Sequence, residues 1–256
     1  MMTNVANFKH QEFLVSVDWL LENLEDPNLR IYDCTAHLIP HPTETYTIGS
    51  GKGDYEKAHI PGADFLDLQQ ELSNNTSKLR FTFPSAEHFS KAIGAHGLSN
   101  DNQAILYSTT SPQWATRIWW MLRAFGFDNA KVLDGGLIRW VQKGYPTSTI
   151  PSTYPAQSFT AKPRPGLIIQ KSDVLLGIHE SNTCIINALS QEQHTGVGGR
   201  TYGRPGRIKD SENVPTTELI DPETNEFYPA AVIAERFASV GTQSSCLLYT
   251  SDAADD

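Results

Sequence analysis

The chain has 256 residues, with 20 Lys and Arg against 29 Asp and Glu, and a formal net charge of -9. Hydrophobic residues make up 39% of it and charged residues 19%, a balance that supports a buried core and excludes wholesale disorder. An acidic chain lacks the Lys/Arg face that a phosphate backbone requires, so no nucleic-acid partner is expected. No apolar run approaches the ~18 residues of a membrane span, so no membrane partner is expected either.

The N-terminus and the cysteines bear on the compartment. Residues 1–11 contain no apolar stretch of the kind that marks a secretory signal. The three cysteines, Cys34, Cys184 and Cys246, are too few and too widely spaced for a disulfide framework or a zinc cluster. We therefore expect a soluble, cytoplasmic protein in a reducing environment, with no metal and no cofactor.

The first half of the chain alternates predicted helices and strands. Apolar spacing predicts helices over 15–24 and 114–125, and short buried strands over 28–34, 103–107 and 131–133. Strands separated by helices are typical of the α/β class, in which helices cover both faces of a parallel sheet.

The second half repeats this order after a break. Residues 146–165 are rich in Pro, Ser and Thr and lack periodicity, which predicts an extended interdomain linker. The pattern then restarts weakly, with a helix over 168–178, a buried strand over 183–188 and a helix over 232–240. The two halves therefore indicate an internal duplication.

The sharpest local pattern is the run His59-Ile60-Pro61-Gly62-Ala63. Proline fixes φ, glycine permits a positive φ and alanine permits close packing, so the run predicts a tight turn that leads into a strand. We interpret His59 as a structural residue that fastens this turn rather than as a catalytic acid or base.

These residues resemble a known family. The turn is similar to the first signature of the rhodanese family, and Val132-Leu133-Asp134-Gly135-Gly136 with Trp140 resembles the end of a rhodanese domain. Residues 115–123 (ATRIWWMLR) resemble the helix after the catalytic loop in tandem-domain thiosulfate and mercaptopyruvate sulfurtransferases. The resemblance covers about residues 12–241, and it implies an α/β fold with two rhodanese-like domains, each a parallel five-stranded sheet flanked by helices.

The resemblance also implies a reaction. In tandem members the C-terminal domain is catalytic, and a cysteine begins a short loop between a strand and a helix. Its thiolate takes a sulfane sulfur from thiosulfate or 3-mercaptopyruvate, forms a persulfide, and passes the sulfur to cyanide or a thiol. Consecutive N–H groups at a helix N-terminus favour such a thiolate. The implied partners are a small-molecule sulfur donor and a small-molecule or thiol acceptor.

The cysteine position of the first half is occupied by Ser108, which follows the predicted strand directly. A serine hydroxyl cannot become a persulfide, so the first domain is expected to be non-catalytic. Cys34 and Cys184 are interpreted as residues of predicted strands without a catalytic role. Cys246 is rejected as well, because Gly241 matches Gly97 and the second loop is then expected near position 252.

The last residues suggest a different origin. Residues 246–256 read as the translation of a transposase-type sequencing adapter, so the native protein is expected to differ beyond Ser245. The second domain is then expected to lack its loop-bearing strand and its catalytic cysteine. The expected division is a non-catalytic rhodanese-like domain over 12–145, a linker over 146–165, a partial rhodanese domain over 166–245 and an adapter-derived tail over 246–256.

The substrate-binding residues depart from the family pattern. Leu189 and Gln193 stand where the resemblance implies two arginines. Arg200, Arg204 and Arg207 follow on a Gly/Pro-rich stretch. These three are either an anion clamp that replaces the missing arginines or a solvated basic loop.

The favoured function is therefore that of a sulfurtransferase whose catalytic cysteine is absent from this chain. Two alternatives remain open. One is a non-catalytic rhodanese-like protein that binds anions or a partner. The other is a phosphatase or arsenate reductase on the same fold, for which a cysteine loop one residue longer would be diagnostic.

Overall fold

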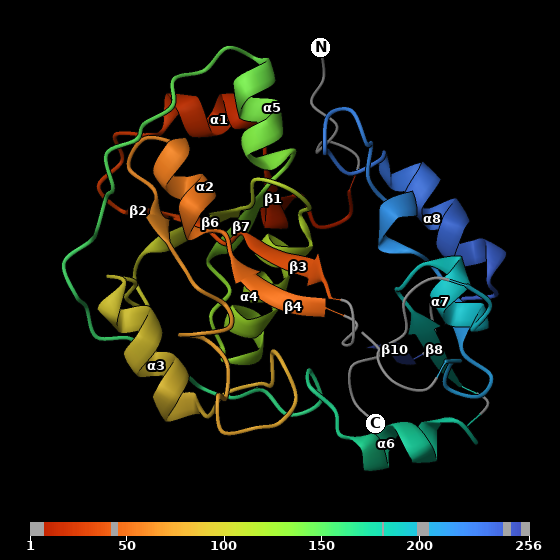
Figure 1. The fold of residues 1–256 in the computed structure, drawn as a ribbon. Coiled ribbons are helices and arrows are strands. Elements are labelled where there is room, and N and C mark those ends of the chain that lie inside the picture. Colours follow the sequence, from red (N-terminus) through yellow and green to blue (C-terminus); the bar gives the residue numbers. More distant parts are fainter. Residues whose placement is uncertain (1–7, 42–45, 181, 199–204, 243–246, 252–256) are drawn as a thin grey trace. The chain divides into compact units, whose positions relative to one another are not determined.

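The computed structural model describes residues 8–41, 46–180, 182–198, 205–242 and 247–251, and the chain forms two compact units (Figure 1). The first unit comprises Met1–Ile39, Ile48–Pro165 and Pro222–Phe227. The second comprises Pro40–Thr47, Gly166–Asp221 and Tyr228–Asp256. None of the helices in the described ranges is both long enough and apolar enough to cross a membrane.

A five-stranded parallel sheet forms the centre of the first unit, with the strand order β1-β7-β6-β2-β5. The strands, from one edge to the other, are Leu14–Val15, Ala130–Leu133, Gln103–Tyr107, Leu29–Asp33 and Asp64–Phe65. The predicted α/β class and parallel sheet are therefore confirmed. The short run Gln11–Phe13 forms a 3-10 turn before β1.

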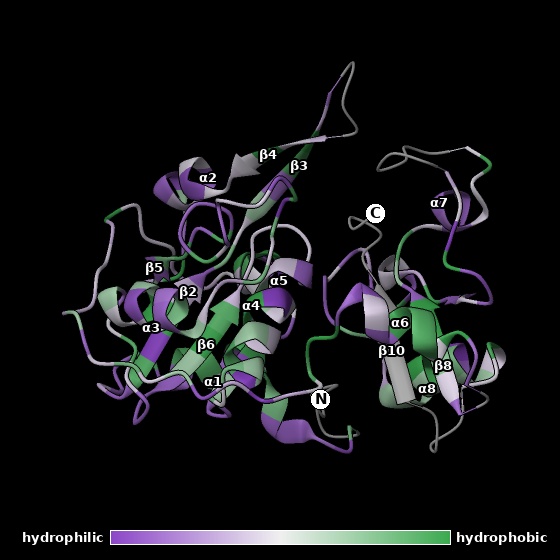
Figure 2. Cartoon of the chain, turned by 90° about the horizontal axis from the view of Figure 1, so that it is seen from below, coloured by the Kyte–Doolittle hydropathy of each residue, from purple (hydrophilic) through white to green (hydrophobic). Residues whose placement is uncertain are grey.

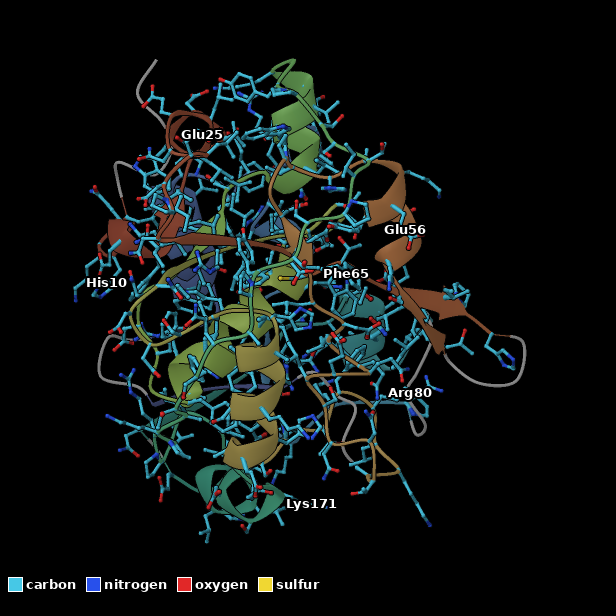
Figure 3. All side chains as sticks on the ribbon, turned by 90° about the vertical axis from the view of Figure 1, so that its left-hand side faces the viewer. His10, Glu25, Glu56, Phe65, Arg80 and Lys171 are labelled. Atoms are coloured by element: carbon cyan, nitrogen blue, oxygen red, sulfur yellow. The ribbon has the colours of Figure 1, made fainter. Side chains whose placement is uncertain are left out.

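Helices cover both faces of this sheet. Helices α3 (Ala86–Ala95) and α4 (Gln113–Ala124) pack on one face, and α1 (Val17–Glu22), α2 (Lys52–Lys57) and α5 (Gly136–Gln142) pack on the other. Side chains alternate along each strand, so Leu106 joins the first core while Ile105 and Tyr107 join the second. Figure 2 shows β6 as a hydrophobic strand among helices of mixed polarity. On the second face Phe65 is buried, whereas Glu56 on α2 lies at the surface (Figure 3).

A two-stranded sheet of β3 (Ala36–Pro40) and β4 (Tyr46–Ser50) was not predicted from the sequence. Its residues lack the regular alternation of a half-buried strand. The pair is fastened to α2 instead, where His37 Nε2 lies 2.7 Å from Asp54 Oδ2. This is a tertiary contact that no local pattern announces.

The stretch from 146 to 165 belongs to the first unit rather than hanging free between units. We call it the strap. Phe159 is only 6% exposed, and its ring centroid lies 5.6 Å from that of Phe127. The Tyr154 hydroxyl donates to Gly62 O at 2.8 Å and accepts from Ile31 N at 3.0 Å. The first unit therefore extends about 20 residues beyond the expected boundary at 145, because two aromatic side chains bind the strap to the core.

The second unit repeats part of this architecture. Its described helices are α6 (Lys171–Gly177), α7 (Gln191–Thr195) and α8 (Ala230–Ser239), with a 3-10 turn at Thr216–Glu218. Strands β8 (Thr183–Asn187), β9 (Glu212–Asn213) and β10 (Leu247–Ser251) form a parallel sheet in the order β10-β8-β9.

Strand β10 corrects one expectation, because the second unit was expected to lack its loop-bearing strand. Residues 247–251 occupy that place and pair with β8 over five positions. The pairing uses backbone N–H and C=O groups, which any non-proline residue offers, and the apolar run Leu247-Leu248-Tyr249 suits a strand position.

Candidate active site

The two units share one strand arrangement around the central strand of each sheet. In the first unit β6 and β5 flank β2, and Asp33 pairs with Tyr107 on one side and Phe65 on the other. In the second unit β10 and β9 flank β8, and Asn187 at the same place pairs with Ser251 and Asn213. The carboxyl ends of β6 and β10 therefore occupy equivalent positions, at the edge of the sheet where parallel α/β sheets bind ligands.

The loop of the first unit is closed by its own hydrogen bonds. Ser108 is 1% exposed, and its hydroxyl donates to Ser111 O at 2.5 Å. The N–H of Thr109 donates to Thr35 Oγ1 at 2.8 Å, and the Thr35 hydroxyl donates to Asp33 Oδ1 at 2.5 Å. The Thr109 hydroxyl donates to the other oxygen of Asp33 at 3.4 Å. A buried carboxylate thus organises the loop, an arrangement that disfavours a bound anion.

Sequence reasoning missed this Asp33 network. Its signal was present in the pattern Asp33-Cys34-Thr35, because an aspartate commonly accepts from the N–H and side chain two residues on. The N–H of Thr35 does donate to Asp33 Oδ1, at 2.9 Å. The loop residue that completes the network lies 76 positions away in Thr109, and only the tertiary structure brings it there.

The Cys34 thiol near this edge is held in the protonated form by a raised pKa. Burial raises the pKa of Cys34 well above its ordinary value, and the adjacent Asp33 carboxyl raises it further. Burial likewise raises the pKa of Asp33, although the hydrogen bonds from Thr35 oppose the shift. Cys34 is therefore a buried residue at a strand end, as predicted, and neither it nor Cys184 is in a disulfide.

The predicted turn is present and His59 fastens it. The imidazole is fully buried, with Nδ1 2.7 Å from Tyr55 O and Nε2 3.0 Å from Ile150 O in the strap. The turn closes through Ala63 N to Ile60 O at 3.0 Å, and Gly62 has φ of 81°. The structural interpretation of His59 is confirmed.

The second unit keeps the same turn with different residues. Ser211 N donates to Ile208 O at 3.1 Å, and Asp210 has φ of 59° where the first unit has a glycine. Arg207 stands in the place of the buried histidine but is exposed. The backbone of the turn is therefore retained while its fastening side chain is lost.

The two positions where arginines were expected make local contacts instead. Leu189 N donates to Asn187 Oδ1 at 2.9 Å, and Asn213 Nδ2 donates to the carbonyls of both Asn187 and Leu189 at 2.9 Å. Gln193 closes the first turn of α7 with Ser190, each backbone N–H donating to the other's side-chain oxygen. This edge therefore offers hydrogen bonds but no charge at those positions.

The three candidate substrate-binding arginines are only partly visible. Arg200 and Arg204 lie outside the described residues, as does Cys246. Burial, then the positive charge of Arg207, lowers the pKa of His194, while Glu212 opposes the shift. Arg207 is thus electrostatically coupled to a buried histidine of α7. In the parts of the chain that are described, no cluster of His, Cys, Asp and Glu is assembled that could hold a metal ion.

Comparisons with known proteins agree with this geometry. The rhodanese-like domain family model matches residues 16–143. A thiosulfate/3-mercaptopyruvate sulfurtransferase 2 of Arabidopsis thaliana is 31% identical over 260 residues, covering 91% of this chain and 73% of that protein. A 3-mercaptopyruvate sulfurtransferase of Escherichia coli K12 is 33% identical over 216 residues, covering 81% of this chain and 73% of that protein.

A solved structure shows the same architecture. The crystal structure of SseA from Escherichia coli, described as having the rhodanese fold of 3-mercaptopyruvate sulfotransferases, matches with a TM-score of 0.79 at 30% identity. It covers 93% of this chain and 87% of that one. On the family model, the relatives and the fold together, the chain belongs to the rhodanese family and to its thiosulfate/3-mercaptopyruvate sulfurtransferases.

Proposed function

We propose that the protein moves a sulfur atom from thiosulfate or 3-mercaptopyruvate to cyanide or a thiol, through a cysteine persulfide in the second unit. With 3-mercaptopyruvate, the thiolate attacks the donor sulfur, the C–S bond breaks, and pyruvate leaves as its enolate, which is then protonated. With thiosulfate, a thiolate attacks the outer sulfur, a new S–S bond forms, and sulfite leaves with the electron pair of the broken S–S bond. Cyanide then attacks the outer persulfide sulfur, thiocyanate leaves, and the thiolate is restored. The names of the relatives support both donors.

One observation carries the location of this chemistry. The first unit has no thiol at its loop position, Ser108, and its loop amide at Thr109 is engaged internally. The remaining candidate position is the residue after β10, because β10 matches β6 in register. That residue is Asp252 in this sequence, and Cys246 precedes the strand. We infer that the catalytic cysteine belongs to native sequence beyond Ser245, and that the present chain is inactive.

We further infer that Arg200, Arg204 and Arg207 bind the anionic donor. Donor and thiolate are both negative, so a guanidinium is needed to offset their repulsion. Neutral Leu189 and Gln193 cannot supply that charge, and Gln193 is occupied in capping α7. The exposed Arg207 leaves its charge available at the turn before β9. Losing one such contact should raise the donor KM by about ten- to a hundredfold.

The test compares three proteins in a thiosulfate-to-cyanide assay and a mercaptopyruvate assay. We expect no turnover by the 256-residue chain or by its Cys246→Ser variant, and turnover with a persulfide at the loop cysteine by the product of the complete native gene. Activity of the present chain that disappears in Cys246→Ser would refute the location. A complete gene product without activity would support a non-catalytic binding protein instead.

The arginine proposal is tested in the active gene product. Arg204→Ala and Arg207→Ala should raise the donor KM, whereas Arg164→Ala, which removes an arginine bound to Asp128 of the first unit, should not. If the two single variants and their double variant turn over the donor like the parent, Arg204 and Arg207 are only part of a solvated loop.

A further inference from the structure

Residues Pro222–Phe227 belong to the first unit although the second unit flanks them in sequence. We call this segment the clip. The chain enters it from Asp221 and leaves it at Tyr228, both of which are in the second unit. Helix α8 begins at Ala230, only three residues after the clip ends. Only Tyr228 and Pro229 separate the clip from α8, so a contact that fixes the clip also restricts the start of α8.

The end of the clip is held by a buried carboxyl. The N–H of Phe227 donates to Asp134 Oδ1 at 2.8 Å, and the Phe227 ring packs against the core of α3 and α4. Asp134 is 3% exposed and follows β7 directly at the carboxyl edge of the sheet. A buried acceptor of this kind ties the clip backbone to the centre of the first unit.

Helix α5 holds the rest of the clip. Arg139 Nε lies 3.2 Å from Glu226 Oε1, with side chains 29% and 25% exposed. Gln142 Nε2 donates to the carbonyl of Glu223 at 2.6 Å. Gly135 leaves room for this approach, since a Cβ there would lie 3.1 Å from Glu226 Cγ and closer still to Arg139. Both α5 and the glycine before it therefore contact the clip directly or leave space for it.

Helix α8 is held weakly by burial, although Arg236 lies 3.7 Å from Glu218 of the same unit. None of its residues is buried, whereas α3, its counterpart in the first unit, buries Phe89 and Ile93 completely or nearly so. An isolated helix of ten residues is marginal in water, so its stability has to come from tertiary anchoring. The clip provides such an anchor immediately before its first turn.

We propose that the edge formed by Asp134, Gly135 and α5 is a docking site for the chain's own clip, and that this docking stabilises α8 of the second unit. The non-catalytic unit then acts on the second unit through the Phe227–Tyr228 junction, whether or not the second unit carries out sulfur transfer.

The test is amide hydrogen exchange on the full 256-residue chain. Glu226→Arg and Arg139→Glu should each speed exchange of both the clip and α8 by roughly threefold or more, and the double variant with the charges swapped should restore both. Because the pair is partly exposed, these variants should fold. Asp128→Arg is the matched control, since it breaks the Arg164 ion pair elsewhere in the first unit and should leave α8 unchanged.

Two results would overturn the proposal. Faster exchange of the clip with unchanged exchange of α8 would make the clip a purely local contact. Failure of the swapped pair to restore protection would show that Arg139 and Glu226 do not act on each other. A milder variant, Glu226→Gln, should change exchange in the same direction as Glu226→Arg but by less.

Discussion

The Ser108 hydroxyl donates its hydrogen bond to the carbonyl of Ser111, three residues on in the same loop. The bond turns the side chain back into the loop, while the neighbouring Thr109 N–H is bound to Thr35. The first unit therefore differs from a sulfur-transfer site in more than the loss of one sulfur atom. The Thr109 N–H already donates to Thr35 and cannot stabilise a thiolate, and the nearby Asp33 carboxylate would repel one.

We expect Ser108→Cys to remain inactive for this reason. The new thiol would be buried, next in sequence to Thr109, whose hydroxyl bonds to Asp33. Burial and Asp33 already raise the pKa of Cys34, which follows Asp33 in the chain. Persulfide formation needs a thiolate, so no sulfur should be found at position 108 by mass spectrometry after incubation with thiosulfate. A persulfide on the introduced thiol, or turnover by this variant, would show that the Asp33 network does not suppress the loop.

The strap should be important to the first unit. Tyr154→Phe leaves the Ile31 N–H without its acceptor inside the protein, so urea unfolding should show a loss of about 1–3 kcal/mol. Tyr145→Phe is the matched control: its hydroxyl bonds to the partly exposed Asp18, where water can replace it, and the loss should be smaller. If both variants lose the same unfolding free energy, the hydrogen bond between Tyr154 and Ile31 does not anchor the strap to the core.

The two equivalent turns predict opposite effects of adding and removing a glycine. Asp210→Gly should stabilise the second unit by about 0.5–1 kcal/mol, because an L-residue at φ of 59° is strained. Gly62→Ala should cost about 1 kcal/mol, and since a Cβ there meets no atom within 4 Å the cost is conformational. Hydrogen exchange across each turn measures both effects. A stabilising Gly62→Ala would contradict the argument.

A histidine at the end of α3 should make stability fall at high pH. Burial alone would lower the pKa of His96, but its hydrogen bonds to Asp64 and Glu71 outweigh this and raise it to about 9. The folded pKa exceeds the unfolded value, so the contribution is complete below about pH 6.5 and is lost as pH rises through about 9.

His96→Gln measures that contribution. The variant should lose about 1–3 kcal/mol of unfolding free energy near pH 6 and much less near pH 10, relative to the parent protein. His10→Gln serves as the control, because His10 and its ion-pair partner Glu12 are both exposed. If His96→Gln lowers the free energy of unfolding equally at both pH values, the charged form of His96 does not contribute to stability.

Much of the fold follows from local patterns in the sequence. Strands β2, β6, β7 and β8 and helices α1 and α4 lie within a few residues of the predicted ranges, because apolar spacing reports which face of an element is buried. The turn at His59 was predictable from the conformational limits of proline and glycine. The absence of a thiol at position 108 was likewise readable once the strand before it was recognised.

The tertiary structure alone decided how distant segments complete these elements. The strap and the clip have no periodicity, yet Phe159, Tyr154 and Phe227 pack or hydrogen bond against residues far away in sequence. The closure of the first loop likewise depends on Asp33 meeting Thr109. Local patterns report what each segment buries, not which partner it is buried against. That choice depends on three-dimensional packing and on satisfying buried polar groups, and both are properties of the whole fold.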